Sequence, residues 1–567
     1  MSTISRFLDQ AEHCQSLFEN AIRKLEIPTC QVFFNQGVLT PVAFKEAGIP
    51  LTTKDTAAVN AAFPNSVAAS QNQTLVADAS NAKPATGKRV AVLFSGGPAA
   101  GGHNVIAGLF RILGSANALL GVKAGPKGLI QGDLFEISAA NIDQIVNTGG
   151  FDFLGSDRTK IKSDAQFEGV RQTCIKHNLD AIVVIGGDDS NTNAAVLAEK
   201  LYSGVKADGS GVQVIGAPKT IDGDLQIGDL LPISFGFDTA TKIYAEMVGN
   251  ILQDTPSSRK YWHFIKIMGR AASHVALEVA LQTKPAVTLI SEEVAEKQLS
   301  LAEIVDSIAK TVIQRAAGDM NYGVVLIPEG LIEFIPEMTA LLQDLNDKLA
   351  ECKDELAGKT IAQQCELING KLKPEHAKLM ASLPDYIVDM LMAERDSHGN
   401  LQVSLIPTER LLIDMTAARV KALDASVKFH TLNHFFGYEG RCGAPTLFDA
   451  AYTYNLGLTV GSLILAGKTG FIASIKDLDQ GGTPLALPLT GLLNIERRHG
   501  HDEMVIEKAL VKTSSPAFQY FAQRRAAWAA GDCFCSPGPR QLWGPASRQM
   551  PLSVALNRDY ASMEFEF

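Results

Sequence analysis

Residues 181–190 read Ala-Ile-Val-Val-Ile-Gly-Gly-Asp-Asp-Ser, five apolar residues followed by two glycines and two acids. The apolar run is typical of a strand buried in a parallel sheet. The glycines allow the backbone to turn tightly and to approach a ligand closely. Asp188 and Asp189 follow at the carboxyl end of this strand, where open α/β sheets bind their ligands. This stretch therefore predicts both a fold class and a binding site.

A second acidic turn follows another expected strand, Val212–Ile215, and reads Pro218-Lys219-Thr220-Ile221-Asp222-Gly223-Asp224. Two strand ends that carry four carboxylates and one lysine favour a site for a metal ion and phosphate. Mg²⁺ prefers oxygen ligands and needs only one or two carboxylates when a substrate supplies phosphate oxygens. Surface turns, in which Asp and Gly are common, are the alternative interpretation.

Strands and helices alternate regularly from Val90 onward. The pattern predicts a strand at Val90–Phe94, a turn at Ser95-Gly96-Gly97, and a helix from Gly101 to about Leu113. Further expected strands are Ala181–Ile185, Val212–Ile215, Trp262–Met268, Ala286–Ile290 and Tyr322–Ile327. This alternation predicts an α/β protein with parallel sheets wound in βαβ units. The glycine amides of the first turn suit an anion, and a tight turn without a ligand is the alternative interpretation.

The composition excludes several classes of protein. The chain has 567 residues, of which 46% are hydrophobic and 20% are charged, as in soluble globular proteins of two or three domains. Its net charge of −10 argues against nucleic acid and against an anionic membrane surface as partners. Residues 450–467 are the most membrane-like stretch, but their Tyr, Asn, Thr and Gly residues predict a buried core helix.

The cysteines and the N-terminus bear on the compartment. Eight scattered cysteines, without a C-x-x-C motif, and an N-terminus without an apolar signal core predict free thiols in the cytoplasm.

Three motifs resemble functional sites but fit structural roles better. Residues 461–469 nearly form a P-loop, but the first glycine is one residue too early, so a helix end is expected. His499-Gly500-His501 near Glu503 is expected to be a solvated turn rather than a metal site. Cys533-Phe534-Cys535 lacks partner ligands nearby in the sequence.

Seven motifs, in this order, resemble the phosphofructokinase family, and specifically its long pyrophosphate-dependent type. They are Ser95-Gly-Gly with Gly101-Gly-His-Asn104, Gly155-Ser-Asp-Arg158-Thr-Lys160, Gly186-Gly-Asp-Asp-Ser190, Pro218-Lys-Thr-Ile-Asp-Gly-Asp224, Lys266-Ile-Met268-Gly269-Arg270, Pro328-Glu329-Gly330 and Gly437-Tyr438-Glu-Gly-Arg441. The resemblance implies reversible phosphoryl transfer from pyrophosphate to the C1 hydroxyl of fructose 6-phosphate, with Mg²⁺, giving fructose 1,6-bisphosphate and phosphate. It also implies a dimer or larger assembly, and we expect a homodimer.

The resemblance implies two Rossmann-like domains whose parallel sheets face a cleft. We expect an N-terminal extension over 1–87, in which 61–87 forms a surface segment leading into the core. The pyrophosphate- and Mg²⁺-binding domain is expected over 88–260, and the fructose-6-phosphate-binding domain over 261–330 and 400–490. Leu342, Leu345, Leu349, Cys352 and Leu356 alternate by three and four, which predicts a helical insertion over 331–399. A C-terminal extension over 491–567 is expected to pack on the core.

Two residues imply that the donor is pyrophosphate. ATP-using relatives have glycine where Asp189 stands, and they lack a lysine at the position of Lys219. A carboxylate there obstructs and repels the α-phosphate and nucleoside, whereas a lysine can neutralise bare pyrophosphate. The alternatives are an ATP-dependent 6-phosphofructokinase and a regulatory, non-catalytic subunit, which in this family loses the Gly-Gly-Asp-Asp pattern.

The resemblance assigns roles to individual residues, with Asp222 as the base that takes the proton of the C1 hydroxyl. The implied catalytic residues are Asp222, Lys219, Arg270, Thr220 and Asp224. Pyrophosphate is implied to contact Gly96, Gly97, Arg158, Lys219 and Asp189, and the metal to contact Asp188 and Asp224. The implied sugar-phosphate contacts are Thr220, Asp222, Lys260, Met268, Gly269, Arg270, Glu329, Tyr438 and Arg441. Tyr438 and Arg441 are expected to hold the 6-phosphate, and Lys260 is the candidate lent across a subunit interface.

Overall fold

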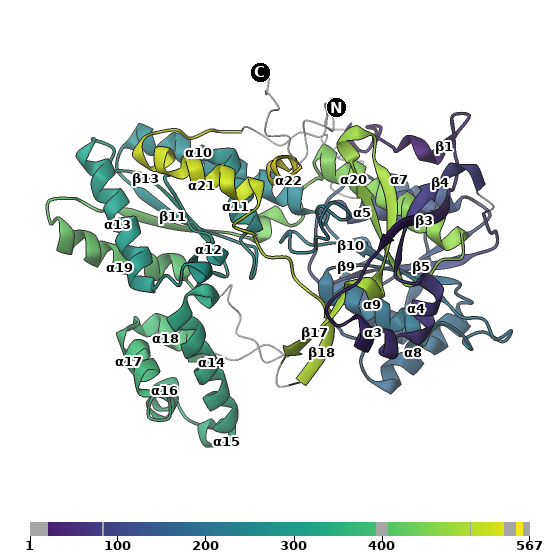
Figure 1. The fold of residues 1–567 in the computed structure, drawn as a ribbon, viewed down its shortest axis with the longest axis horizontal. Helices are drawn as coiled ribbons and strands as arrows, with labels where there is room; N and C mark the ends of the chain where they lie inside the picture. Colours follow the sequence, from purple (N-terminus) through teal and green to yellow (C-terminus); the bar gives the residue numbers. More distant parts are fainter. Residues whose placement is uncertain (1–20, 82–83, 393–405, 499–500, 538–550, 559–567) are drawn as a thin grey trace, which may run out of the picture.

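The computed structural model describes residues 21–81, 84–392, 406–498, 501–537 and 551–558. Two lobes lie side by side, each built around its own β-sheet (Figure 1). The two sheets have ten and four strands. This is the expected α/β architecture, with one difference in the larger sheet.

The sheet of the first lobe is parallel only at its centre. The central parallel strands are, in spatial order, β15 (Phe471–Lys476), β10 (Gln213–Pro218), β9 (Ala181–Gly186), β5 (Arg89–Ser95) and β6 (Ala118–Val122). Antiparallel strands extend it on one side, namely β16 (Thr483–Pro488), β4 (Gln73–Asp78) and β3 (Ala43–Pro50), and β7 (Leu134–Glu136) on the other. The short strand β8 (Ser156–Asp157) pairs with the end of β5.

Helices cover both faces of this sheet. In β5, Val90 and Val92 face a core that includes α5 (Gly102–Leu113) and α20 (Leu447–Leu465). Ala91 and Leu93 face a second core formed with α8 (Asp164–Lys176) and α9 (Asp188–Lys200). Because successive strand residues point to opposite faces, a strand covered on both sides needs a continuous apolar run, which is what the sequence shows.

The second lobe has an entirely parallel sheet. Its strands are, in spatial order, β12 (Val287–Thr288), β13 (Gly323–Pro328), β11 (Trp262–Ile267) and β14 (Thr431–Phe436). One face packs on α10 (Phe237–Ser258) and α11 (His274–Thr283), and the other on α13 (Leu301–Ala317) and α19 (Thr408–Leu423). The sequence predicted β11 and β13 within one residue at each end.

The expected helical insertion is helical over residues 336–392, while residues 393–399 of the predicted range lie outside the described residues. It comprises α14 (Pro336–Glu351), α15 (Lys353–Leu356), α16 (Ile361–Asn369), α17 (Pro374–Ser382) and α18 (Asp385–Met392). Leu342, Leu345 and Cys352 are buried in one core with the outer face of the second sheet. Because α14 ends at Glu351, the predicted run of regularly spaced apolar residues continues from α14 into α15.

The chain returns to the first lobe earlier than expected, which corrects the domain boundaries. β15 and β16 join the first sheet, so residues 447–490 belong with the first lobe rather than the second. The partner of β15 is β10, which lies about 250 residues earlier, and no local pattern reveals such a pairing. Residues 61–87 are likewise more than a surface segment, because β4 lies inside the sheet and buries Thr74 and Leu75.

The helices α5 and α20 cross at very short range. A Cβ on Gly108 would lie 2.2 Å from the Tyr454 carbonyl oxygen, and a Cβ on Gly457 would lie 2.2 Å from that of Val105. Glycine at both positions lets the two backbones touch. All of α20 is buried, which confirms the core helix expected at 450–467. Among the described residues, no helix is long and apolar enough to cross a membrane.

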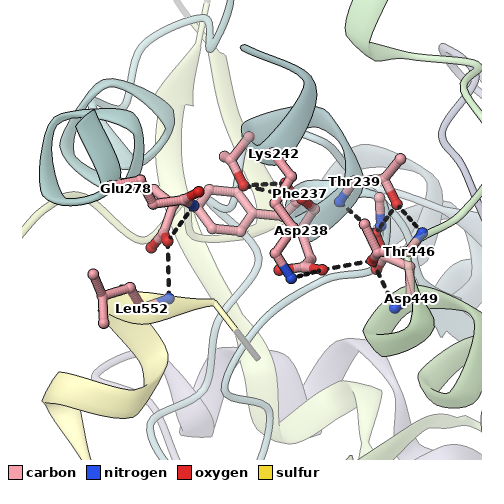
Figure 2. A network of polar contacts seen from close by, with 11 residues as sticks. Phe237, Asp238, Thr239, Lys242, Glu278, Thr446, Asp449 and Leu552 are labelled. Atoms are coloured by element: carbon pink, nitrogen blue, oxygen red, sulfur yellow. Dashed lines mark hydrogen bonds and ion pairs between the residues drawn. The ribbon is translucent and has the colours of Figure 1, made fainter. Parts of the chain in front are cut away.

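A network of polar contacts fixes the start of α10 against α20 (Figure 2). Asp449 accepts hydrogen bonds from the Gly236 amide (3.0 Å), the Thr239 amide (2.8 Å) and the Thr239 hydroxyl (2.6 Å). Asp238 accepts from Lys242 Nζ (2.8 Å) and from the Thr446 hydroxyl. Burial, followed by the charge of Asp238, raises the pKa of Asp449 to about 7. The network therefore fixes the segment that leads out of the second acidic turn.

The C-terminal part of the chain contacts both lobes. The hairpin of β17 (Leu493–Arg498) and β18 (His501–Ile506) packs against α9 of the first lobe (Figure 1). Residues 507–512, which we call the strap, then lead to the second lobe. There α21 (Pro516–Ala530) packs on α13 and α22 (Leu552–Asn557) packs on α11, where Glu278 accepts from the Leu552 and Ser553 amides (Figure 2).

Candidate active site

The loops that follow β5, β9 and β10 meet at one edge of the first sheet. These strands are parallel neighbours, so their carboxyl ends lie together. The first loop carries Gly96 and Gly97, the second carries Asp188 and Asp189, and the third carries residues 219–224. The structure therefore brings together the motifs that sequence analysis singled out.

Three cationic side chains approach the glycine turn after β5. Gly96 has φ +86°, and a Cβ there would lie 3.1 Å from Lys219 Nζ. A Cβ on Gly97 would lie 2.7 Å from Arg441 Nη2 and 3.8 Å from Arg158 Nη2. Backbone amides, a lysine and two arginines thus converge where a side chain would not fit. This arrangement suits an anion with several charges.

Lys219 is held firmly in this position. Its amide donates to the Gly186 carbonyl (2.9 Å), and its side chain is buried. Burial lowers the pKa of Lys219 to about 8, although the carboxylate of Asp222 partly opposes this effect. The lysine is therefore a cation at lower pH and loses its charge as the pH rises through about 8.

Three acids of the site are buried: Asp188, Asp222 and Asp224. Burial, with the charges of Asp222 and Asp188, raises the pKa of Asp224 to about 7. Burial, with the charge of Asp189, also raises the pKa of Asp188 above its usual value. Such a cluster of carboxylates is relieved by a bound cation.

A metal ion fits two of these acids. Asp188 Oδ2 is buried and has no hydrogen-bond partner within the part of the chain that the structure describes. In the same part, no group of three or more His, Cys, Asp or Glu side chains is arranged to hold a metal by itself. Two carboxylates plus phosphate oxygens and water are the coordination that Mg²⁺ usually takes at phosphoryl-transfer sites.

Backbone contacts set the geometry of the second acidic turn. The Asp222 amide donates to the Thr220 hydroxyl (3.1 Å), and the Thr220 amide donates to the Phe235 carbonyl (3.3 Å). Gly223 has φ +72°, and a Cβ there would lie 2.7 Å from the ring of Phe237. Asp222 and Asp224 therefore flank a glycine that no larger residue can replace without displacing Phe237.

The second lobe contributes the loops after β11 and β13. Glu329 Oε2 accepts from the amides of Gly269 (3.0 Å) and Arg270 (2.8 Å), and Met268 is buried beside them. Burial opposes the charge of Arg270, but the carboxylates of Asp222, Asp188 and Asp224 outweigh it and raise the pKa of the guanidinium. Arg270 thus carries positive charge from the second lobe to the acids of the first.

The loop after β14 holds Tyr438 and Arg441. Tyr438 is 67% exposed, and the Arg441 guanidinium lies 5.1 Å from the centroid of its ring. Tyr244 of α10 supports this loop, because its hydroxyl donates to the Gly437 carbonyl and its ring leaves no room for a Cβ on Gly440. Sequence analysis missed Tyr244, which lies in a helix without any recognisable motif.

One predicted residue lies elsewhere in this chain. Lys260 precedes β11, whereas Met268 follows it, so about 20 Å of extended strand separates them. Its Nζ lies 5.0 Å from the centroid of the Tyr261 ring. Any contact of Lys260 with substrate requires a second copy of the chain, as the sequence analysis assumed, and stays a prediction.

The structure bears differently on the three motifs that resemble functional sites in the sequence. α20 ends at Leu465, and the Thr469 hydroxyl accepts from the Val214 amide (2.9 Å), which confirms that the P-loop lookalike is a helix end. Glu503 pairs with Lys160 (3.0 Å) and Lys162 (3.4 Å), while the side chains of His499 and His501 lie outside the described residues. Cys533 is exposed and Cys535 is partly buried, both as free thiols.

Sequence analysis also missed Lys508 in the strap. Its charge offsets part of the rise in the pKa of Asp188 and Asp224, so it belongs to the electrostatic environment of the site. It stands in no motif, and only the path of the C-terminal segment brings it to the acids.

Comparison with known proteins agrees with this geometry. The model of the family described as phosphofructokinase matches residues 89–464, which include the site loops of both lobes. The chain belongs to the phosphofructokinase family.

The relatives of this phosphofructokinase-family chain include close ones. It is 50% identical over 470 residues to the pyrophosphate–fructose 6-phosphate 1-phosphotransferase of Treponema pallidum, a match that covers 81% of each chain. It is 47% identical to the enzyme of the same name from Porphyromonas gingivalis, over 80% of this chain and 84% of that one.

A solved structure shares the fold. The pyrophosphate-dependent phosphofructokinase of Marinobacter aquaeolei superposes with a TM-score of 0.50 at 17% identity, covering 80% of this chain and 96% of that one.

Proposed function

We propose that this phosphofructokinase-family chain is a diphosphate–fructose-6-phosphate 1-phosphotransferase. It transfers a phosphoryl group reversibly from pyrophosphate to the C1 hydroxyl of fructose 6-phosphate, giving fructose 1,6-bisphosphate and phosphate. The observation that carries the proposal is Lys219 Nζ beside Gly96, with Asp189 on the neighbouring helix start. Relatives of 47% and 50% identity that bear this name support it.

The charge of the site and the space within it select the phosphoryl donor. Lys219 and the glycine amides neutralise a bare pyrophosphate, which has no nucleoside to anchor it. Asp189 is exposed in the first turn of α9, next to Asp188. We propose that a nucleotide donor would extend from its β-phosphate toward this side chain. Its carboxylate repels and obstructs that extension, so pyrophosphate is accepted and ATP is rejected.

Asp222 starts the reaction. It accepts the proton of the C1 hydroxyl, and the oxygen then attacks the nearer phosphorus of pyrophosphate in line, while the second phosphate leaves. Thr220 fixes the Asp222 backbone, and Lys219, Gly96, Gly97 and Arg270 stabilise charge on the transferred and leaving groups. Arg158, close to Gly97, contributes to the same anion site. Positioning and electrostatics account for most of the catalysis in phosphoryl transfer.

We propose Mg²⁺ as the cofactor. When bound, it supplies charge neutralisation for the pyrophosphate oxygens. Asp188 and Asp224 would hold it, and the buried Oδ2 of Asp188, which has no hydrogen-bond partner among the described residues, supports this assignment. The raised pKa of both carboxyls indicates that the site favours a cation in place of protons.

The second lobe binds the sugar phosphate. Met268 and Gly269 line the sugar, Glu329 accepts from its hydroxyls, and Tyr438 and Arg441 bind the 6-phosphate, Arg441 as a two-pronged donor. Arg270 then links the two substrates, because its charge acts on the acids of the opposite lobe.

Initial rates of fructose 1,6-bisphosphate formation test the proposal. The purified chain is assayed with Mg²⁺ and fructose 6-phosphate, and with either pyrophosphate or ATP. We expect turnover with pyrophosphate alone. Turnover with ATP but not with pyrophosphate would show that the chain is instead an ATP-dependent 6-phosphofructokinase. No turnover with either donor would favour a regulatory subunit. The intact Gly186–Gly187–Asp188–Asp189 sequence speaks against the last alternative.

The assembly and compartment also belong to this proposal. We expect a homodimer, in which Lys260 of one copy reaches the 6-phosphate bound by the other. The cytoplasm, expected from the thiols, stays a prediction.

A further inference from the structure

The strap is fastened to both lobes at the candidate site. Just before it, the Ile506 amide donates to the Thr192 hydroxyl of α9 (3.0 Å), the helix that begins at Asp188. Within it, the Ala509 amide donates to the carbonyl of Asp224 itself (2.7 Å). Hydrogen bonds donated by main-chain amides therefore fix the backbone on both sides of Lys508.

The far end of the strap is tied to the second lobe. The Ala509 carbonyl accepts from His274 Nε2 of α11 (2.8 Å), and the Val511 amide donates to Glu292 (2.9 Å) in α12 (Ser291–Glu296). None of these bonds involves the side chain of Lys508, so the position of the backbone does not depend on the lysine. The ammonium remains available to a ligand.

The charge of Lys508 acts on acids of both lobes. It interacts with Asp188 and Asp224, and also with Glu333 of the second lobe. The hydrogen bond between the Ala509 amide and the Asp224 carbonyl (2.7 Å) holds the neighbouring residue, Lys508, beside these acids. Lys508 is half-buried, which limits screening of its charge by water.

The excess of negative charge at the site favours a further cation such as Lys508. Magnesium pyrophosphate is itself an anion, and it enters a site that already holds Asp188, Asp189, Asp222 and Asp224. A further cation beside the metal-binding acids compensates for this repulsion.

We propose that Lys508, contributed by the C-terminal strap, binds magnesium pyrophosphate beside Asp188 and Asp224 and is a further substrate-binding residue of the enzyme. The inference rests on the proposed function, because it assigns a ligand of the same reaction. It assigns Lys508 to the donor rather than to the sugar.

Steady-state kinetics of Lys508→Met in the full chain test this assignment. We expect the KM for pyrophosphate to rise about 10-fold or more, as for a lost charge-assisted contact, while the KM for fructose 6-phosphate changes less than about twofold. Lys508→Arg should recover most of the affinity, because it restores the charge. Lys512→Met is the matched control, since Lys512 is an exposed lysine of the same strap, and it should behave as the unaltered chain.

Calorimetric titration with pyrophosphate and Mg²⁺ separates the possible failures. If the unaltered chain turns over pyrophosphate and the Lys508→Met variant binds pyrophosphate equally well, the role of Lys508 is overturned. The proposed function then still stands. An equal loss of affinity for both substrates, without rescue by arginine, also overturns it and indicates a structural lysine. An unaltered chain that neither binds nor turns over pyrophosphate overturns the proposed function and this inference together.

Discussion

Asp222 is the residue on which the proposed chemistry depends most directly. Asp222→Asn keeps the size of the side chain and removes its basicity. We expect kcat to fall about 10²- to 10⁴-fold, the range for loss of a general base, while the affinity for fructose 6-phosphate stays within a few-fold. Rates and calorimetric sugar binding measure the two effects separately.

The matched control is Asp229→Asn, which alters an exposed acid a few residues further along the same loop region. It should leave both quantities unchanged. Loss of sugar binding in Asp222→Asn would contradict a purely catalytic role.

Lys219 gives the enzyme an alkaline limit. Its pKa of about 8 lies below that of an ordinary lysine, so its charge is present at lower pH and is lost as the pH rises through 8. We expect kcat/KM for pyrophosphate to fall above about pH 8, since this parameter reports ionisation in the free enzyme. A pH profile of initial rates measures it.

Lys219→Arg identifies the group responsible. Arginine stays charged throughout this range, so the alkaline fall should disappear or move beyond about pH 10. A fall that stays near pH 8 in the variant would show that another group titrates there.

At the residue scale, the sequence predicted those site residues that stand in glycine–acid motifs. Asp188, Lys219 and Asp222 follow strands whose apolar runs are unmistakable, so their meeting at one sheet edge could be deduced. Tyr244 and Lys508 could not be deduced in this way. One lies in an ordinary helix and the other in a strap, and tertiary packing alone brings them to the site.

At the scale of elements, the crossing of α5 and α20 is the contact least tolerant of change. In Gly108→Ala the new methyl group would meet the backbone of α20 at the Tyr454 carbonyl, which no rotation of a side chain can relieve. We expect a loss of about 1–3 kcal/mol in the free energy of unfolding, typical of overpacking, measured by denaturant titration.

Gly531→Ala is the control for this substitution. A Cβ on Gly531 meets no atom within 4 Å, and its φ of −150° is open to any residue. Its stability should stay within about 0.5 kcal/mol of the unaltered chain. Equal stability of Gly108→Ala would show that the helices can move apart.

The sequence predicted strands well and their partners poorly. β9 and β13 are apolar runs that end at Gly186 and Pro328, and β5 ends just before Gly96, so local chemistry suffices to find them. β4 and β15 are equally regular, yet they were assigned to a surface segment and to the wrong domain. Tertiary packing decides which strands pair across hundreds of residues, and such packing cannot be inferred from a single sequence.

At the scale of the whole molecule, the two lobes share one hydrophobic core. It runs from Val90 and Ile215 of the first sheet, through Tyr244 and Val248 of α10, to Ile265 of the second. The strap adds hydrogen bonds to both lobes at the site. We therefore expect a single calorimetric unfolding transition rather than one for each lobe.

Ile327→Ala tests this coupling, because Ile327 is fully buried in β13, on the face of the second sheet away from the shared core. A loss of about 2–5 kcal/mol there should lower the temperature of the whole transition. Splitting of the transition in two would show that the lobes unfold independently.

The late arrival of β15 has a consequence for the way the protein is made. Its partner β10 ends at Pro218, 253 residues before β15 begins at Phe471. At ribosomal speeds of about 5–20 residues per second, the nascent chain carries an open edge of β10 for about 13 to 50 s. An unpaired apolar strand edge invites aggregation. Production in cells should therefore depend on chaperones, or on slow expression at low temperature, more than the stability of the finished enzyme suggests.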